Sequence, residues 1–221
     1  MAGDSIRTLL VEDHEITRLG LRKALESIAR VTVVAEAADG NTAVSVAIEL
    51  QPDLVLMDIG LPGKDGIQAT KAIKDALSAK VIMITSHDNE EDIFAALSAG
   101  AEAYCLKDIS TAQLANAIYS VIDGALWLDP GIAKTVLKQI ELGRTRALSA
   151  SAPRGDTFGL SERENQVLNL LVEGLSNQQI GERLFLSPDT IKTHLCHIFD
   201  KLRVSGRTQA AIKAVRSGLF S

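Results

Sequence analysis

Five short apolar runs, each of strand length, alternate with helix-length stretches through the first 125 residues of the chain. The runs are apolar on both faces, which is typical of strands in a parallel sheet that helices cover on both sides. Their alternation with helical stretches predicts βα units and a doubly wound α/β domain with a five-stranded parallel sheet. The runs span 8–12, 31–37, 54–58, 81–85 and 103–106, and the helical stretches span about 15–29, 41–50, 66–76, 90–99 and 110–123.

The rest of the chain has a different pattern. Residues 160–221 show only short helical pieces, and the first begins with Ser161 and Glu164 in the spacing of a capping box. Before them, a helix is expected over 131–142, and residues 143–159 are rich in Ser, Ala, Gly and Arg without a sustained period, as in a linker. We therefore predict an α/β domain over 1–125, a helix and flexible linker over 126–159, and a small all-α domain over 160–221.

Charge is divided unevenly between these parts. Residues 1–159 hold 15 basic and 22 acidic residues, a formal charge of −7, whereas residues 160–221 carry +2. An acidic front and a mildly basic end indicate two modules with different partners.

No apolar run approaches the roughly 20 residues that span a bilayer, and acids stand where a secretory signal would be basic. With Cys105 and Cys196 far apart, we expect a cytoplasmic protein without membrane segment or disulfide framework.

Charged and hydroxyl side chains stand where the predicted strands end. Glu12 and Asp13 close the first strand, Asp58 closes the third, Thr85 stands at the end of the fourth and Lys107 follows the fifth. Ligands of open α/β sheets bind at this edge. One acid there is usually a solvated loop residue, but several carboxylates that meet repel one another unless a cation joins them. The full set therefore predicts a Mg²⁺ site beside a phosphate-handling rim.

Residues 6–123 resemble the receiver domain of two-component response regulators, which has a flavodoxin-like fold. The resemblance is carried by LLVED at 9–13, LVLMDIGLPGKDG at 54–66, VIMITSH at 81–87 and YCLKD at 104–108. It implies that Asp58 accepts a phosphoryl group from a sensor histidine kinase. It also implies that Asp13, Asp58 and the Gly60 carbonyl hold Mg²⁺, that Glu12 acts through a water, and that Thr85 and Lys107 bind the phosphoryl group.

For other residues near this edge, the sequence does not point to one specific role in the site. Tyr104 is either the aromatic side chain that swings inward when Thr85 moves, as the resemblance implies, or an ordinary half-buried strand residue. Asp108 stands where many receivers have proline, which affects only the local loop geometry. We interpret His14 and His87 as hydrogen-bonding loop residues rather than catalysts.

The helix expected over 188–202 is amphipathic. An apolar stripe that should be buried contains Ile191, Leu195, Ile198, Phe199 and Leu202, and the opposite face contains Lys192, Thr193, Cys196, His197 and Asp200. A short helix, a Gly/Ser turn and this helix have the proportions of a helix-turn-helix, which places its second helix in the major groove of DNA. The pattern alone also fits a small protein-binding module.

Residues 160–219 resemble the LuxR-type DNA-binding domain through LSERE, GLSNQQIGERL, LSPDTIKTHL and KLRVSGR. The two domains together resemble a response regulator of the NarL/FixJ type. This implies double-stranded promoter DNA, a sensor histidine kinase, RNA polymerase and a second copy of the chain on DNA as partners. By motif position, Lys192, Thr193 and Cys196 face bases, and the candidates for phosphate contacts are Thr190, His194, His197 and the backbone amides near Asn177 and Ser187.

With the helix over 188–202 in the major groove, a single copy of the chain should bind DNA with only modest affinity. Cys196 offers weak, largely apolar contacts, and Asp200 repels phosphate. Modest affinity favours dimerisation, for which we predict the helix over 207–215, where small residues permit close approach. The predicted interface residues are Arg207, Ala210, Ala211 and Ala214.

The leading hypothesis is a phosphorylation-switched transcription regulator that is not an enzyme. Several alternatives compete with it. A phosphatase with an aspartyl nucleophile is disfavoured, because Gly60 stands where such enzymes have a second acid. A metal site at His194 and His197 is disfavoured because Cys196 points elsewhere. A phosphorylation-independent DNA-binding regulator, whose receiver only mediates protein contacts, is disfavoured by the complete acidic set.

The opposite charges of the two parts lead us to expect the receiver to dock on the DNA-binding face.

Overall fold

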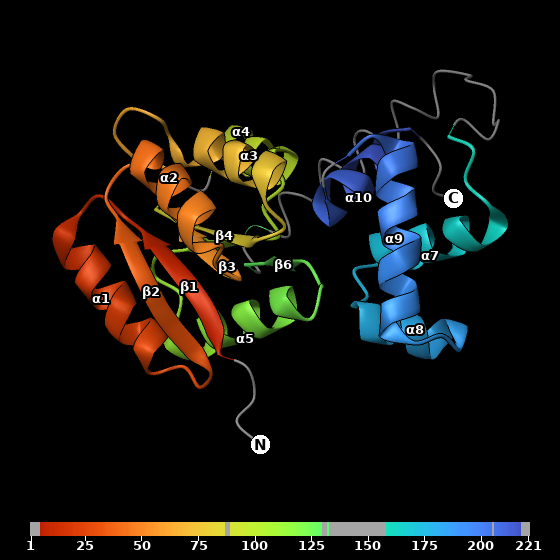
Figure 1. The fold of residues 1–221 in the computed structure, drawn as a ribbon, viewed down its shortest axis with the longest axis horizontal. Coiled ribbons are helices and arrows are strands. Elements are labelled where there is room, and N and C mark those ends of the chain that lie inside the picture. Colours follow the sequence, from red (N-terminus) through yellow and green to blue (C-terminus); the bar gives the residue numbers. More distant parts are fainter. Residues whose placement is uncertain (1–4, 87–88, 130–131, 133–157, 205, 218–221) are drawn as a thin grey trace.

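The computed structural model describes residues 5–86, 89–129, 132, 158–204 and 206–217. These residues form an α/β part and a helical part (Figure 1). The helix expected over 131–142, apart from Ile132, and the linker over 143–157 lie outside the described residues.

The described residues form a six-stranded, fully parallel sheet with the order β2-β1-β3-β4-β5-β6. Five strands match the predicted runs, and a sixth, two-residue strand pairs in parallel with β5, with Ala103 opposite Trp127 and Tyr104 opposite Leu128. Two residues are too few to form an apolar run of strand length, so the sequence pattern missed this edge strand. The strands are β1 (Ile6–Val11), β2 (Val31–Ala37), β3 (Leu54–Met57), β4 (Lys80–Thr85), β5 (Ala103–Leu106) and β6 (Trp127–Leu128).

Helices cover both faces of this sheet, as the doubly apolar strands predict. Successive strand residues point to opposite faces, so Leu9 packs in a core with α2, α3 and α4, whereas Leu10 packs in a core with α1 and α5. Both leucines are fully buried, and each stabilises the fold by about 2 kcal/mol. The helices are α1 (Glu15–Glu26), α2 (Gly40–Leu50), α3 (Gly66–Ala76), α4 (Glu90–Ala99) and α5 (Thr111–Ile122).

The helical part has a core of its own, built from α7 (Glu162–Val172), α8 (Asn177–Leu184), α9 (Pro188–Leu202) and α10 (Arg207–Arg216). The predicted capping box is confirmed, because Ser161 and Glu164 form it at the start of α7. At the start of α9, the Ser187 hydroxyl accepts a hydrogen bond from the Thr190 amide. Lys201 of α9 donates to the Glu164 carboxylate at 2.7 Å and to the Gly159 carbonyl at 2.9 Å. The first turn of α7 is therefore tied to the end of α9.

Replacing the capping carboxylate is expected to weaken the helical part. Burial alone would raise the pKa of Glu164, but hydrogen bonds from Lys201 and Ser161 outweigh it and lower the pKa to about 2. Glu164→Gln is expected to cost about 1 kcal/mol of unfolding free energy at neutral pH. Because the pKa is lower in the folded state, this stability is present above the unfolded pKa and is lost as the pH falls from about 4.5 towards 2.

The measurement is chemical unfolding of the wild type and the variant at pH 7 and at pH 3, followed by circular dichroism. The wild type should lose more stability than Glu164→Gln between the two pH values. Glu162→Gln, which changes an exposed acid in the same helical turn, is the matched control. An equal pH response of all three proteins would contradict the role of Glu164.

Candidate phosphoryl-accepting site and nucleic-acid interface

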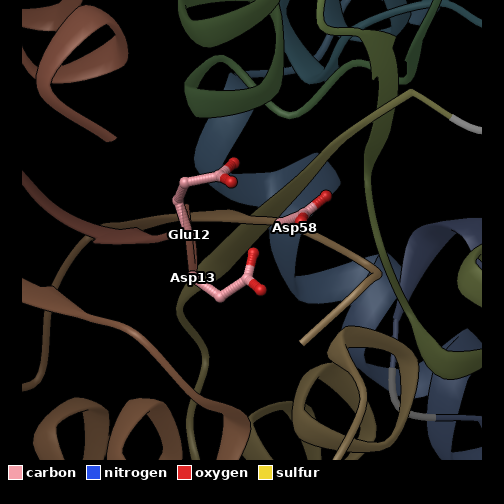
Figure 2. Close-up of side chains that lie close together, drawn as sticks. All are labelled: Glu12, Asp13 and Asp58. Carbon is pink, nitrogen blue, oxygen red and sulfur yellow. The ribbon is translucent and has the colours of Figure 1, made fainter. Parts of the chain in front are cut away.

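Three carboxylates meet at the carboxyl edge of the sheet. Glu12 and Asp13 directly follow β1, and Asp58 directly follows β3, which lies next to β1 with Val11 opposite Met57. One carboxylate oxygen from each residue lies within 4.8 Å of the others. Figure 2 shows the three side chains gathered around one point. The neighbouring strands bring together acids that are 45 residues apart in the chain.

Lys107, which follows β5, neutralises part of this charge. Its Nζ lies 2.7 Å from a Glu12 oxygen and 3.1 Å from an Asp58 oxygen. Partial burial lowers the pKa of Lys107, but the hydrogen bond to Glu12 and the charge of Asp58 outweigh it, so the pKa lies above its ordinary value. Glu12 is fully buried and Asp58 is 4% exposed, so the ammonium group offsets repulsion that water does not screen. Asp58 is therefore buried at the end of its strand and does not face solvent, as a single acid at such a position usually does.

The donor set fits a hard divalent cation. Mg²⁺ takes oxygen ligands and usually keeps several waters. Asp13 is exposed, so the carboxylate cluster opens to solvent on its side. A Cβ placed on Gly60 would lie 3.7 Å from Asp58 Oδ2, so the Gly60 backbone lies beside the cluster. Among the described residues, these three acids form the one group of His, Cys, Asp or Glu side chains that is close enough to hold a metal ion.

Two further predicted residues of the α/β part, Thr85 and Tyr104, lie on β4 and β5. Thr85 is buried at the end of β4, and its carbonyl accepts a hydrogen bond from the Lys107 amide at 2.9 Å. Tyr104 is fully buried in the core shared with α2, α3 and α4. The expectation of an ordinary half-buried strand residue at this position is therefore wrong. His14 lies with its Nδ1 3.1 Å from the Thr17 hydroxyl. His87 lies outside the described residues.

Arg18, which no sequence pattern predicted as part of the site, fixes the backbone next to the acids. Its guanidinium donates to the Glu12 carbonyl at 2.8 Å and to the Asp13 carbonyl at 3.3 Å, and it forms a 3.3 Å ion pair with Glu36. Arg18 therefore links α1 and β2 to the residues that follow β1. No local motif marks it, because its partners come from two separate segments, the residues after β1 and strand β2.

Helix α9 presents the polar face that the sequence predicted. Lys192, Thr193, Cys196 and His197 are exposed, whereas Ile191, Leu195, Ile198 and Leu202 are buried in the helical core. Thr190 and His194 are half-buried. Ser187 caps the helix, and Asn177, at the start of α8, accepts a hydrogen bond from Arg207 through Oδ1 at 3.2 Å.

The predicted dimerisation helix α10 lies against the α/β part instead of standing free (Figure 1). The Thr208 hydroxyl donates to the Ala101 carbonyl and Gln209 Nε2 donates to the Ser98 carbonyl, each at 2.7 Å. Ile212 packs against the core of the α/β part.

This arrangement differs from the expected docking on the DNA-binding face. The contact uses backbone carbonyls near the end of α4 and an apolar side chain, rather than opposite charges, and it leaves the polar face of α9 exposed. Of the residues predicted to contact DNA, Asn177 lies against the α/β part, because a Cβ placed on Gly124 would be 3.1 Å from its Nδ2. The opposite net charges of the two parts therefore do not select the docking surface.

The four residues predicted to form a dimer interface are not equally available. Ala210 and Ala214 are fully buried in the core of the helical part, and Arg207 is 4% exposed. The Arg207 guanidinium donates to the Leu175 carbonyl as well as to Asn177. Only Ala211 is partly exposed. Close approach by the two buried alanines therefore serves the packing of α10 on its own domain.

A parallel α/β sheet with an acidic cluster and a lysine at its carboxyl edge, followed by a four-helix part with an exposed polar helix, is the arrangement of a response regulator with a DNA-binding output domain. Comparison with known proteins agrees. The response regulator receiver domain family matches residues 8–119, and the luxR family of bacterial regulatory proteins matches residues 159–214. The chain belongs to the two-component response regulators of the NarL/LuxR family.

Relatives match the chain over nearly its whole length. It is 40% identical over 217 residues to the transcriptional regulatory protein LiaR of Bacillus subtilis, covering 98% of this chain and 100% of that one. It is 35% identical over 218 residues to the response regulator VraR of Staphylococcus aureus, covering 98% and 99%. Among solved structures it is similar to the response regulator ChrA of a heme-sensing two-component system, with a TM-score of 0.53, 40% identity and coverage of 98% and 100%.

A second solved structure shows a similar protein with nucleic acid. The complex of the response regulator RcsB with DNA has a TM-score of 0.57, is 25% identical, and matches over 96% of this chain and 99% of that one. Within the part of the chain that the structure describes, no helix is long and apolar enough to cross a membrane.

Proposed function

We propose that this protein is a transcription regulator that a sensor histidine kinase switches by phosphorylating Asp58. The observation that supports this most is the pairing of Lys107 with both Glu12 and Asp58 inside the acidic cluster. It places one cation beside the carboxylate that would accept the phosphoryl group. A carboxylate is a weak nucleophile, so such a transfer depends on positioning and on cations that neutralise phosphoryl oxygens.

In this proposal different residues of the site hold the metal ion, bind the phosphoryl group and respond to it. Asp13, Asp58 and the Gly60 carbonyl would hold Mg²⁺, with Glu12 acting through a water, and the bound ion would neutralise charge on the phosphoryl oxygens. Lys107 would pair with the phosphoryl group, and the Thr85 hydroxyl would donate a hydrogen bond to it. Tyr104 would follow the movement of Thr85 inside the core.

The same proposal assigns the exposed face of α9 to DNA. Lys192, Thr193 and Cys196 would face bases in the major groove of a promoter. Thr190, His194, His197 and the amides near Asn177 and Ser187 would contact phosphates. A second copy of the chain on the DNA and RNA polymerase would be its protein partners, and the work would take place in the cytoplasm.

The contact between α10 and α4 supports a specific switch. While α10 donates hydrogen bonds to the carbonyls of Ser98 and Ala101, it is not free to pair with a second copy. Phosphorylation of Asp58 would weaken this contact through Thr85 and Tyr104 and release the helix for dimerisation. A change of about 1.4 kcal/mol in this equilibrium already alters the ratio of the two states tenfold.

A regulator whose receiver is never phosphorylated is the competing function. The two are separated by incubating the protein with a small-molecule phosphodonor and Mg²⁺, measuring intact mass, and then titrating promoter DNA with treated and untreated protein. Our proposal expects one added phosphoryl group and tighter DNA binding after treatment. A protein that binds promoter DNA equally well before and after, with no added mass, would support the competing function.

Removal of the receiver is expected to free the helical part. Because residues 158–217 have their own core, a fragment beginning at Phe158 should fold alone. We expect it to bind promoter DNA at least as tightly as the unphosphorylated full-length protein, since α10 is no longer held by α4. Fluorescence anisotropy at fixed salt, with both proteins on one promoter fragment, measures this. Much weaker binding by the fragment would show that the receiver promotes DNA binding, chiefly as a dimerisation device.

A further inference from the structure

The loop that carries Asp58 and Gly60, residues 58–65, is held by close backbone contacts. The Ile59 carbonyl accepts hydrogen bonds from the Leu61 amide at 2.8 Å and the Gly66 amide at 3.0 Å. A Cβ placed on Gly66 would lie 1.8 Å from the Asp58 carbonyl oxygen. The start of α3 therefore lies directly against the backbone of the candidate phosphoacceptor.

A second close contact comes from a separate element, α2. Gly40 is the first residue of this helix and is buried. A Cβ on Gly40 would lie 2.1 Å from the Lys64 carbonyl oxygen and 3.0 Å from the carbonyl carbon. The first turn of α2 thus lies directly against the Lys64 end of the loop, and only a residue without a side chain allows this approach.

No local requirement explains a glycine at this position. Gly40 is not among the described glycines with a positive φ, so its backbone conformation is open to other residues. Glycine is also a poor helix former, which makes it an unfavourable first residue. Gly20 in the middle of α1 differs clearly, because a Cβ there would meet nothing within 4 Å.

The start of α2 is itself well anchored. The Asp39 carboxylate accepts from the amides of Asn41 and Thr42, each at 2.9 Å, and from the Thr42 hydroxyl at 2.7 Å. An N-cap with three hydrogen bonds gives the first turn a defined position. The loop therefore rests on a fixed support.

We propose that Gly40 is a positioning residue for the metal and phosphoryl chemistry at Asp58. By letting the start of α2 reach the Lys64 carbonyl, it sets where the loop places the Gly60 carbonyl relative to the Asp58 and Asp13 carboxylates. This inference rests on the proposed function, because it concerns the Mg²⁺ that the acidic cluster would hold.

The expected sensitivity follows from the geometry of the ion. Mg²⁺ demands near-ideal octahedral coordination, so a small displacement of one oxygen ligand weakens binding. A methyl group on Gly40 cannot stay 2.1 Å from a carbonyl oxygen, so the loop or the helix must move by about 1 Å. Gly40→Ala is therefore expected to weaken Mg²⁺ binding by about tenfold or more, the range typical when groups that orient metal ligands are changed.

The test uses full-length protein and two readouts. Isothermal titration calorimetry measures the Kd for Mg²⁺ without a phosphodonor, and intact mass measures the phosphorylation rate as a function of Mg²⁺ concentration. We expect Gly40→Ala to raise the Kd and to need more Mg²⁺, while excess Mg²⁺ restores most of the rate. A Kd within twofold of the wild type would overturn the inference.

Two control variants separate positioning from stability. Gly20→Ala makes the same change on an open helix face and should leave the Kd for Mg²⁺ unchanged. Ala43→Gly removes a buried methyl group one turn further along α2, so it loosens the helix and its packing without adding a group against the loop. If Ala43→Gly raises the Kd as much as Gly40→Ala, lost helix stability explains the effect and the inference fails.

A further variant covers the case in which Gly40→Ala does not fold. Asp39→Ala removes the cap that anchors the first turn of α2 and adds no atoms near Lys64. We expect it to raise the Kd for Mg²⁺ by more than Ala43→Gly does, because only Asp39→Ala releases the first turn of α2 from its position against Lys64. A rise equal to or smaller than that of Ala43→Gly would overturn the inference. The proposed function fails separately, if the wild type gains no phosphoryl group in the presence of Mg²⁺.

Discussion

Asp58→Ala is expected to abolish Mg²⁺-dependent phosphorylation of the protein while leaving its fold intact. In the proposed mechanism, the Asp58 carboxylate is both the group that accepts the phosphoryl group and a ligand of Mg²⁺, so the variant loses the nucleophile itself. The fold should survive because Lys107 keeps its 2.7 Å ion pair with Glu12. Removing one of the neighbouring carboxylates also relieves repulsion among them.

The measurement is intact mass after incubation with a phosphodonor and Mg²⁺, with circular dichroism to confirm folding. Asp108→Ala is the matched control, because it removes an exposed carboxylate directly beside Lys107 and should leave phosphorylation intact. An Asp58→Ala protein that gains the phosphoryl group at the rate of the wild type would refute the assignment of Asp58.

Lys192→Ala is expected to weaken DNA binding by about 1–3 kcal/mol if the lysine reads guanine, mainly through loss of base discrimination. Lys192 is exposed on the polar face of α9, next to Thr193, and it makes no contact that stabilises the helical core. Its removal should therefore not change the fold. If Lys192 contacts phosphate instead, the affinity for all DNA sequences should decrease alike. The slope of log affinity against log salt concentration should then decrease in magnitude by about one.

Anisotropy titrations on promoter DNA and on random DNA, at several salt concentrations, distinguish the two roles. Lys23→Ala on α1 removes the same charge from an exposed helix of the receiver and should have little effect. Unchanged affinity of Lys192→Ala for both DNAs would remove this face of α9 from the interface.

Much of the fold and of the site follows from local patterns in the sequence. Short continuous apolar runs such as 54–57 are enough to predict strands that are buried on both faces, and the exposed and buried faces of α9 follow from a period of 3.6. The capping box at Ser161 and Glu164 is a pattern of four residues, and the structure confirms it. The acids after β1 and β3 were expected to meet because parallel strands bring their carboxyl ends to one edge.

Other features depend on packing between distant residues, and the sequence pattern gave no signal for them. The two-residue β6 is stabilised by its pairing with β5, not by its own composition. Ala210 and Ala214 appeared suited to a dimer interface because they are small, but they fill the core of their own domain. Small size is compatible with either role, so only the packed structure distinguishes them.

The sequence by itself determined the class of each domain, the strand ends that carry the acids, and the face of α9 that is polar, because these depend on residues close together in the chain. Only the tertiary structure decided that Asp58 is buried beside Lys107, that α10 lies on α4, and that the start of α2 at Gly40 lies against the loop of Asp58. Each of these is a distance of a few ångströms between residues far apart in sequence. Such distances are set by how complete elements pack against one another, which no local period or motif encodes.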